Sequence, residues 1–338
     1  AVLRVARSTS REMACCGKTC CRAMKARAPK LRVGGTIRSM RKVSHKSPTV
    51  LAALRRGARA LEAADVFFGH GTDNAWDDAA ALLAYVLHRD GPLDERSAAR
   101  VLKPREEAAF AALIELRIST RQPAVYLTGV TWFAGLPLRT DARALIPRSP
   151  IAELIEQQFR PWVDPARVKR ILDLGTGGGC IALACAHYFP SARVDGTDIS
   201  PEALELAREN RKALGLSRRV RLLESDHFSA LKGRRYDIIV SNPPYVGERE
   251  MRALPPEYRH EPRLALASGK QGLDSVRVIL EQAARHLTPG GILVVEVGNT
   301  ETLLRRRWPR VPFTWLEFER GGGGVFVLTR EQLQRHVR

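Results

Sequence analysis

The sequence has no long hydrophobic run: no apolar stretch approaches the ~20 residues that a membrane-spanning helix needs. Cysteine is also scarce, because only Cys180 and Cys185 lie beyond residue 48. Both sit in an apolar helical stretch, where a cysteine is usually a small core residue. These absences argue against a helical membrane protein and against a disulfide framework. We therefore expect a cytoplasmic protein in a reducing compartment.

Acidic residues are almost missing from the first 48 residues, where Glu12 is accompanied by thirteen Lys or Arg. This segment carries most of the formal net charge of +19, so the rest of the chain is only mildly basic. We predict a basic, disordered extension over residues 1–48, although its composition also resembles that of a transit peptide. Its adjacent cysteine pairs do not match the usual spacing of a zinc site, so we predict no metal centre. These cysteines are Cys15, Cys16, Cys20 and Cys21.

The remaining length is enough for two domains. Residues 49–122 are rich in Ala, Leu and Arg at helical spacing, and we predict a helical substrate-binding domain there. Alternating bulky residues around glycines predict a linking β-hairpin in residues 123–145. Residues 146–338 alternate short apolar strands with helices, which is typical of a doubly wound α/β domain.

Within the helical domain we expect helices over 49–68, 79–87 and 106–119, with Thr72 or Asp73 capping the second. In the linking segment we expect the strands of the hairpin within 124–141, beginning at Val125-Tyr126-Leu127. Ser149 and Pro150 are expected as the N-cap and first residue of a helix over 151–159. In the α/β domain the expected strands are 168–174, 193–197, 220–223, 238–240 and 292–297. The expected helices are 180–188, one that opens at Ser200 and Pro201, and 272–287, followed by a hairpin of 313–318 and 325–328.

Polar residues and glycines follow four successive strands, at the end where open α/β sheets bind ligands. A glycine-rich turn at 175–179 lets the backbone approach a ligand closely, as in both dinucleotide-binding folds and methyltransferases. Asp198 closes the next strand and suits a ribose diol, for which a carboxylate is a bidentate acceptor. Asp226 and His227 follow the third strand and are placed to flank an adenine ring.

The fourth strand ends in a stiff elbow, Asn242-Pro243-Pro244-Tyr245, because proline fixes φ and removes a backbone donor. The Asn242 side-chain oxygen and the Pro243 carbonyl can both accept hydrogen bonds from one planar NH2 group. Such a grip would orient the nitrogen as it attacks, and we expect Tyr245 to pack on the stem of the side chain that carries it. We expect no strong base beside this elbow, so alignment of the reacting atoms should supply much of the rate.

Four motifs in this order resemble those of the protein-(glutamine-N(5)) methyltransferases, from about residue 52 to the C-terminus. Four other stretches resemble the PrmB-type branch, which modifies ribosomal protein uL3: Gly69–Asp78, Ile146–Pro150, Glu257–Pro262 and Phe313–Phe318. The release-factor branch usually has Pro-Asp-Thr-Glu where this chain has Ser149-Pro150-Ile151-Ala152, and Gly178 stands where the family commonly has Ser. The four motifs are Asp173-Leu174-Gly175-Thr176-Gly177, Asp198-Ile199-Ser200, Ser225-Asp226 and Asn242-Pro243-Pro244-Tyr245.

The resemblance implies a seven-stranded, Rossmann-like methyltransferase domain over 146–338 and S-adenosyl-L-methionine as the cofactor. It implies direct methyl transfer to a glutamine side-chain nitrogen of ribosomal protein uL3, a reaction that needs neither nucleic acid nor membrane. It also implies which residues contact the cofactor and which contact the glutamine. The implied cofactor-binding residues are Asp173, Gly175, Thr176, Gly177, Gly178, Gly179, Asp198, Asp226, His227 and Asn242. The implied substrate-binding residues are Asn242, Pro243, Pro244 and Tyr245, of which Asn242, Pro243 and Tyr245 are the catalytic candidates.

Three alternatives remain open from the sequence. The elbow chemistry also suits methylation of the GGQ glutamine of a release factor, or of an adenine or cytosine amine in nucleic acid. Against the nucleic-acid alternative, no sizeable target-recognition domain follows the α/β domain. A non-enzymatic ribosome assembly factor is the third alternative, and the complete set of catalytic elements disfavours it.

Overall fold

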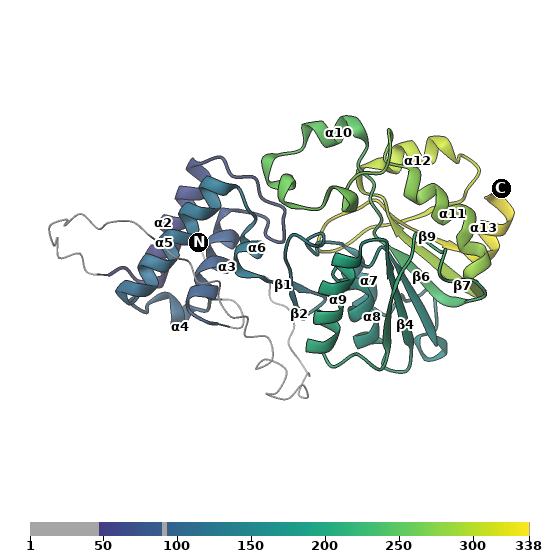
Figure 1. The fold of residues 1–338 in the computed structure, drawn as a ribbon, viewed down its shortest axis with the longest axis horizontal. Helices are drawn as coiled ribbons and strands as arrows, with labels where there is room; N and C mark the ends of the chain where they lie inside the picture. Colours follow the sequence, from purple (N-terminus) through teal and green to yellow (C-terminus); the bar gives the residue numbers. More distant parts are fainter. Residues whose placement is uncertain (1–46, 90–92, 338) are drawn as a thin grey trace. The chain divides into compact units, whose positions relative to one another are not determined.

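The computed structural model describes residues 47–89 and 93–337 (Figure 1). The predicted basic extension lies outside the described residues, apart from Ser47 and Pro48. Within the described ranges, no helix is long and apolar enough to cross a membrane. No cluster of His, Cys, Asp and Glu there has the arrangement of a metal site. The described part consists of a helical region, a short hairpin and a large sheet covered by helices.

The helical region packs its apolar faces into a core of its own. Thr49 caps its first helix, and Asn74 caps the second by accepting a hydrogen bond from the Asp77 N–H at 3.0 Å. The expected cap at Thr72 or Asp73 is wrong, since Thr72 instead donates its hydroxyl proton to the Asp78 carboxylate. The helices are α2 (Val50–Ala63), α3 (Ala75–Val86), α4 (Glu95–Ala98), α5 (Pro104–Thr120) and α6 (Ala124–Thr128).

The linking hairpin is shorter than predicted. It pairs β1 (Val130–Phe133) with β2 (Leu136–Arg139) in an antiparallel ladder. The expected strand at 125–127 is wrong, because these residues form α6, which ends at Gly129 in a left-handed conformation. The boundaries predicted for the domains, 49–122, 123–145 and 146–338, stay predictions.

The large sheet has seven strands in the described part of the chain, in the order β5-β4-β3-β6-β7-β9-β8. Neighbouring strands are parallel from β5 to β7, and β9 is antiparallel to both β7 and β8. This order confirms the predicted doubly wound, Rossmann-like fold, with β3 and β6 at its centre. The strands are β3 (Arg170–Leu174), β4 (Arg193–Asp198), β5 (Val220–Glu224), β6 (Tyr236–Ser241), β7 (Leu287–Glu296), β8 (Thr314–Leu316) and β9 (Val325–Thr329).

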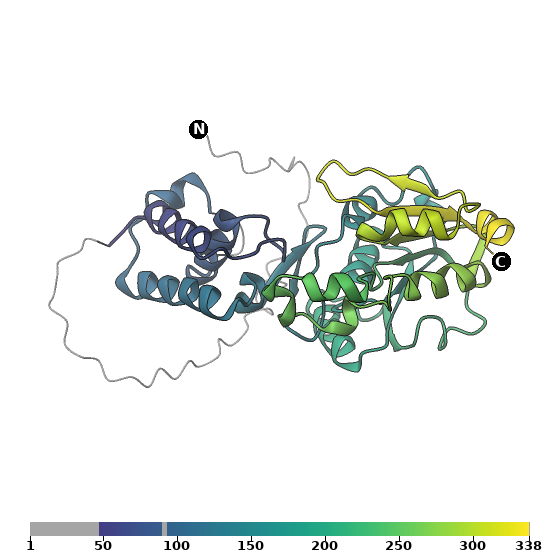
Figure 2. The same cartoon turned by 90° about the horizontal axis from the view of Figure 1, so that it is seen from above.

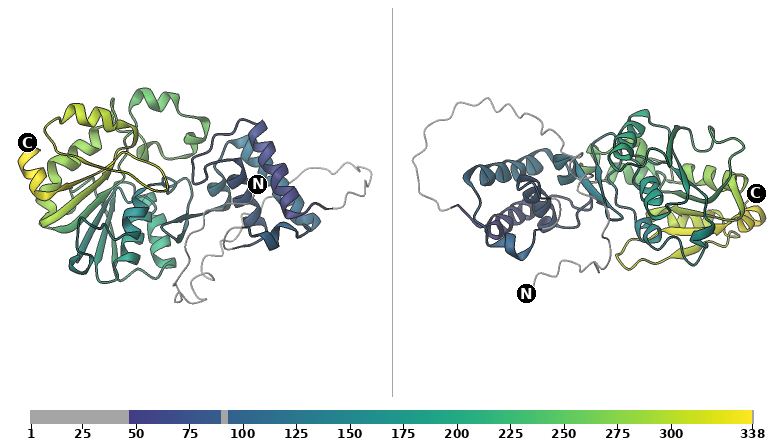
Figure 3. Two further views of the ribbon diagram at one scale, coloured as in Figure 1. Left: turned by 180° about the vertical axis from the view of Figure 1, so that it is seen from behind. Right: turned by 90° about the horizontal axis from the view of Figure 1, so that it is seen from below.

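Helices cover both faces of this sheet (Figures 2 and 3). Successive residues of a strand point to opposite faces, so Ile171 belongs to one hydrophobic core and Leu172 to the other. Cys185 is buried in the first of these cores and Cys180 packs against it, as predicted. The helices are α7 (Ile151–Glu156), α8 (Cys180–Tyr188), α9 (Pro201–Ala213), α10 (Glu248–Ala253), α11 (Asp274–His286), α12 (Glu301–Arg307) and α13 (Arg330–His336). Short 3-10 helices are η1 (Pro165–Arg167), η2 (Pro256–His260), η3 (Arg263–Ala265) and η4 (Gly298–Thr300).

Several predicted helix ends differ from the structure. The first helix ends at Ala63 rather than at residue 68, and α7 ends at Glu156 rather than at residue 159. Pro150 occupies the N-cap position of α7, one residue later than predicted, although the Ser149 hydroxyl does accept a hydrogen bond from the Ile151 N–H.

A buried charge cluster joins the helical region to the 3-10 helix η2. The Arg117 guanidinium, whose side chain is only 1% exposed, donates to Asp78 at 2.9 Å and to the Phe67 carbonyl at 2.8 Å. It also lies 3.6 Å from the Glu257 carboxylate, which is fully buried and accepts the Phe67 N–H. Because each charge here is removed from water, each needs its partners.

Replacing Arg117 by Ala should lower the free energy of unfolding by about 3–5 kcal/mol, since the buried Asp78 would lose its cation and Glu257 would keep only Arg121, at 3.5 Å. Urea denaturation of the purified variant measures this change. The matched control is Arg56→Ala, which breaks an exposed ion pair with Glu107 and should cost at most about 1 kcal/mol. Equal losses in the two variants would contradict this account of the cluster.

Candidate active site

A cavity of about 400 Å³ lies at the carboxyl ends of β3, β4 and β6. Its wall combines the residues that follow these strands with two further segments, the irregular stretch 143–149 and the stretch 262–269, which contains η3. The residues that line it are 143–149, 174–178, 180–181, 198–200, 203, 225–227, 241–244, 262, 264–265, 267–269, 274–275 and 279.

Most of the residues predicted for the site meet in this cavity. Asp173, Gly179 and Tyr245 are not among the residues that line it. The predicted residues that do line it are Gly175, Thr176, Gly177, Gly178, Asp198, Asp226, His227, Asn242, Pro243 and Pro244.

The glycine-rich turn after β3 depends on left-handed backbone conformations. Gly175, Gly177 and Gly179 have φ values of +70°, +53° and +88°, which residues with a side chain rarely adopt. Asp173 stabilises the turn, because its Oδ2 accepts hydrogen bonds from the Thr176 hydroxyl at 2.6 Å and from the Ala182 N–H at 3.0 Å. The turn therefore presents its backbone to the cavity.

Asp198 is placed by the same turn. Its carboxylate accepts the Gly177 N–H at 2.8 Å and the Ser200 N–H at 2.9 Å, which fixes both of its oxygens. Burial raises the pKa of Asp198, and these backbone hydrogen bonds oppose that rise because they favour the anion. Each oxygen keeps a lone pair for a further donor, such as a hydroxyl group.

Asp226 and His227 form the edge of the cavity beyond β5. The His227 Nδ1 lies 2.7 Å from the Asp226 carboxylate, and its Nε2 lies 3.3 Å from the Ser275 hydroxyl. The Asp226 side chain is 68% exposed, so it stands at the rim rather than in the interior.

Asn242 follows β6 in the elbow that the sequence predicts. The last strand residue, Ser241, donates its hydroxyl to the Leu174 carbonyl at 2.7 Å and so ties β6 to β3. The Asn242 Oδ1 is buried and accepts no hydrogen bond within the described part of the chain. A buried acceptor without a donor is rare and costly, so this atom is suited to receive an N–H from a ligand.

Tyr245, the last residue of the elbow, is held by contacts with Glu296 and Gly298. Its hydroxyl donates to the Glu296 Oε1 at 3.2 Å, and its ring packs against Gly298. Its predicted contact with the substrate stays a prediction. Sequence reasoning assigned no role to Glu296.

Sequence reasoning also missed the contribution of Arg148 and Ser149 to the wall. Arg148 donates two hydrogen bonds to Glu261 and lies over the Tyr258 ring, 5.7 Å from its centroid. The resemblance of Ile146–Pro150 to the PrmB-type branch draws attention to this segment, but the partner of Arg148, Glu261, lies 113 residues away in sequence.

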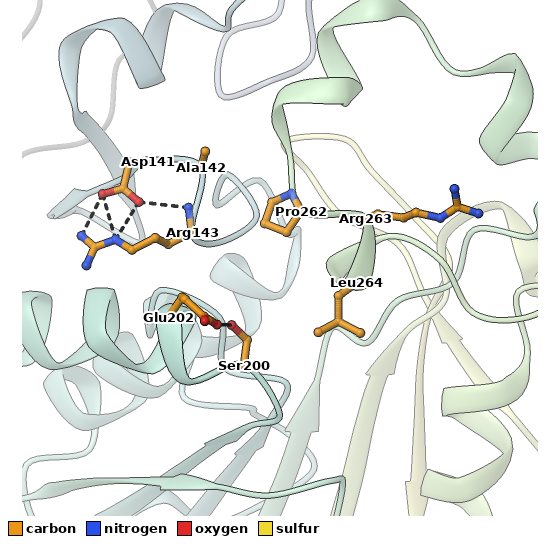
Figure 4. A pocket seen from close by; sticks show the side chains of 8 residues that line it. All are labelled: Asp141, Ala142, Arg143, Ser200, Glu202, Pro262, Arg263 and Leu264. Atoms are coloured by element: carbon orange, nitrogen blue, oxygen red, sulfur yellow. Dashed lines mark hydrogen bonds and ion pairs between the residues drawn. The ribbon is translucent and has the colours of Figure 1, made fainter.

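A second, more open cavity of about 610 Å³ adjoins the first and shares four lining residues with it (Figure 4). Figure 4 shows Arg143 paired with Asp141, and Ser200 hydrogen-bonded to Glu202. Leu264, with 57% of its surface exposed, lies on the opposite side. The shared residues are Arg143, Ser200, Pro262 and Leu264.

Known proteins similar to this chain carry a consistent description. A family model described as "Methyltransferase small domain" matches residues 157–254. The ribosomal protein uL3 glutamine methyltransferase of Xylella fastidiosa strain Temecula1 is 48% identical over 85% of this chain and 92% of its own length. The protein of the same name from Neisseria meningitidis serogroup B is 45% identical over 84% and 94%. The chain belongs to the family of ribosomal protein uL3 glutamine methyltransferases.

This uL3 methyltransferase family member is thus a protein-glutamine methyltransferase, and the resemblance inferred from its motifs is confirmed. Among solved structures, a methyltransferase from Pyrococcus furiosus is 21% identical, with a TM-score of 0.43 over 65% of this chain and 97% of that one. The fold assignment rests on the sheet order rather than on this likeness.

The buried Asp173 of this methyltransferase should give a measurable pH dependence. Burial raises its pKa from 3.8 to about 7, although hydrogen bonds from Thr176 and Ala182 oppose the rise. The native state therefore holds this proton more tightly than the unfolded chain does. The stabilising contribution is fully present below pH 3.8 and is lost as the pH rises through about 7.

Asp173→Asn removes this titration while keeping the shape of the side chain. The free energy of unfolding of the wild type, minus that of the variant, should fall between about pH 4 and pH 7 and then level off. Urea denaturation at several pH values, without added ligand, measures it. A difference that does not change with pH would show that Asp173 does not titrate in this range.

Proposed function

We propose that this enzyme uses S-adenosyl-L-methionine to methylate the side-chain nitrogen of a glutamine in ribosomal protein uL3. The observation that supports this most directly is the buried Asn242 Oδ1, an acceptor without a donor, in an elbow that lines the cavity. The names of relatives at 45–48% identity support uL3 as the protein substrate.

The cavity fits the proposed cofactor. The glycine-rich turn offers open backbone beside the cavity, and Asp198 offers carboxylate oxygens to the hydroxyls of a ribose. Asp226 and His227 would border the adenine. Asp173 and Gly179 would act indirectly, by holding the turn in its conformation. When bound, S-adenosyl-L-methionine supplies an electrophilic methyl group.

The enzyme's own residues would bind and orient the glutamine amide. The Asn242 Oδ1 and the Pro243 carbonyl would each accept one N–H of the NH2 group, and neither proline of the elbow has an N–H that competes. An amide nitrogen is a poor nucleophile, so its alignment should supply much of the rate. The same two acceptors would stabilise the positive charge that develops on the nitrogen, which later loses one proton.

The test of substrate identity is intact-mass spectrometry of purified uL3 and, separately, of a release factor, each incubated with the enzyme and S-adenosyl-L-methionine. We expect a net gain of about 14 Da on uL3 alone, as one methyl group replaces one hydrogen, located on a glutamine by peptide mapping. A mass gain on the release factor alone would contradict uL3 as the protein substrate. No gain on either protein would direct the search to nucleic acids, whose binding would weaken steeply with salt.

Asn242→Ala should lower kcat by about 100- to 1,000-fold, the usual cost of removing one group that stabilises charge in the transition state. Its affinity for the cofactor should change less than kcat, because Asn242 is proposed to act mainly on the amide. Steady-state kinetics at saturating cofactor, with calorimetric titration of the cofactor, separates the two quantities.

The matched variant is Asp198→Asn, for which the opposite pattern is expected: weaker cofactor binding and a kcat close to the wild type once the cofactor saturates. An Asn242→Ala enzyme with a wild-type kcat would contradict the proposed role of the elbow.

A further inference from the structure

The segment 146–149 forms part of the cavity wall without belonging to a helix or a strand. Its position therefore depends on contacts with other parts of the chain. Two buried carboxylates provide these contacts, one near each end of the segment.

Glu261 holds the first end. Its side chain is fully buried and accepts the Ile146 N–H at 3.1 Å and the Arg148 guanidinium at 2.5 and 2.8 Å. The next residue, Pro262, lines the cavity as well. Glu261 therefore ties two parts of the wall, 146–149 and 262–269, to each other.

Glu296, at the end of β7, holds the second end. Its Oε2 accepts the Ser149 hydroxyl, while its Oε1 accepts the Tyr245 hydroxyl at 3.2 Å. Ser149 lines the cavity, and Tyr245 ends the elbow that begins at Asn242. One carboxylate thus joins the wall to the elbow.

The Tyr245 ring has little freedom to leave this position. Gly298 packs directly against it: a Cβ at Gly298 would lie 2.6 Å from the ring Cε2, which is closer than real contacts allow. The ring is therefore held by β7 and η4, through one hydrogen bond and one close packing contact. Glu296 is itself buried, with 6% of its surface exposed.

We infer that Glu296 is a positioning residue for methyl transfer, because it fixes Ser149 and Tyr245 relative to each other. It thereby sets the position of the Asn242 elbow relative to the wall segment 146–149. Glu261 holds the other end of that segment. This inference rests on the proposed function. Glu296 does not line the cavity, so it acts through Ser149 and Tyr245 rather than on the substrate. Errors of about 1 Å in the placement of a reacting group can cost on the order of 100-fold in rate.

Glu296→Gln tests the inference, because it keeps the size of the side chain but cannot accept both hydroxyls through two equivalent oxygens. We expect kcat on uL3 to fall by about 10- to 100-fold, with the affinity for S-adenosyl-L-methionine unchanged. Glu261→Gln should move kcat in the same direction. The matched control is Glu153→Gln, a buried carboxylate that accepts the backbone N–H groups of Glu319 and Arg320 outside the cavity. This control should keep the wild-type kcat.

A double-mutant cycle separates positioning from a purely structural role. Tyr245→Phe removes only the hydroxyl, so if Glu296 acts through it, part of the Glu296→Gln effect on kcat disappears in the Phe background. Fully multiplicative losses would overturn the inference. Should Glu296→Gln fail to fold, Ser149→Ala and Tyr245→Phe decide: at least one must lower kcat at unchanged cofactor affinity, and wild-type turnover in both would overturn it.

Failure of the positioning role and failure of the proposed function give different experimental results. An active wild type with unaffected Glu296 variants contradicts the positioning role alone. A wild type that binds S-adenosyl-L-methionine but leaves uL3 unmodified contradicts the proposed function, and the positioning role with it.

Discussion

A single buried acceptor, the Asn242 Oδ1, is the constraint on which the account of this site depends. Buried polar atoms are almost always hydrogen-bonded, since an unpaired acceptor loses its water without compensation. In this protein the unpaired acceptor lies at the end of a central strand, and two prolines follow it in the sequence. A hydrogen bond from an incoming N–H donor offsets this free-energy cost, and in this way a site can recognise an amide rather than an acid.

The rest of the fold keeps that acceptor in place. β6 lies between β3 and β7, so the elbow begins at the middle of the sheet, beside the glycine-rich turn. Ser241 ties its end to Leu174, and the Tyr245–Glu296 hydrogen bond ties the elbow to β7. Further out, the cluster of Arg117, Asp78 and Glu257 fastens the helical region to η2, a few residues before the cavity-lining segment 262–269. Buried carboxylates recur in these ties because each can accept several donors at once.

Much of the fold and of the cofactor end of the site follows from local sequence. The strands before Gly175 and Asn242 contain short apolar runs ended by residues that stop a strand, so their positions and their common edge could be predicted. The strand expected at 125–127 was wrong because a short, buried apolar run suits a helix as well as a strand, and Gly129 ends α6 in a left-handed conformation. The roles of Glu261 and Glu296 could not be predicted, because the partners of Glu261 lie 113 to 115 residues away in sequence and those of Glu296 lie 51 and 147 residues away. No local pattern records such contacts.

The two-acceptor arrangement limits the number of methyl groups that one glutamine can accept, and this number can be measured. Two acceptors, the Asn242 Oδ1 and the Pro243 carbonyl, require two N–H donors, and a monomethylated amide has only one. Prolonged incubation of uL3 with excess enzyme and cofactor, followed by mass spectrometry of the modified peptide, should therefore reach a plateau at a single methyl group. A dimethylated glutamine would contradict the two-acceptor arrangement.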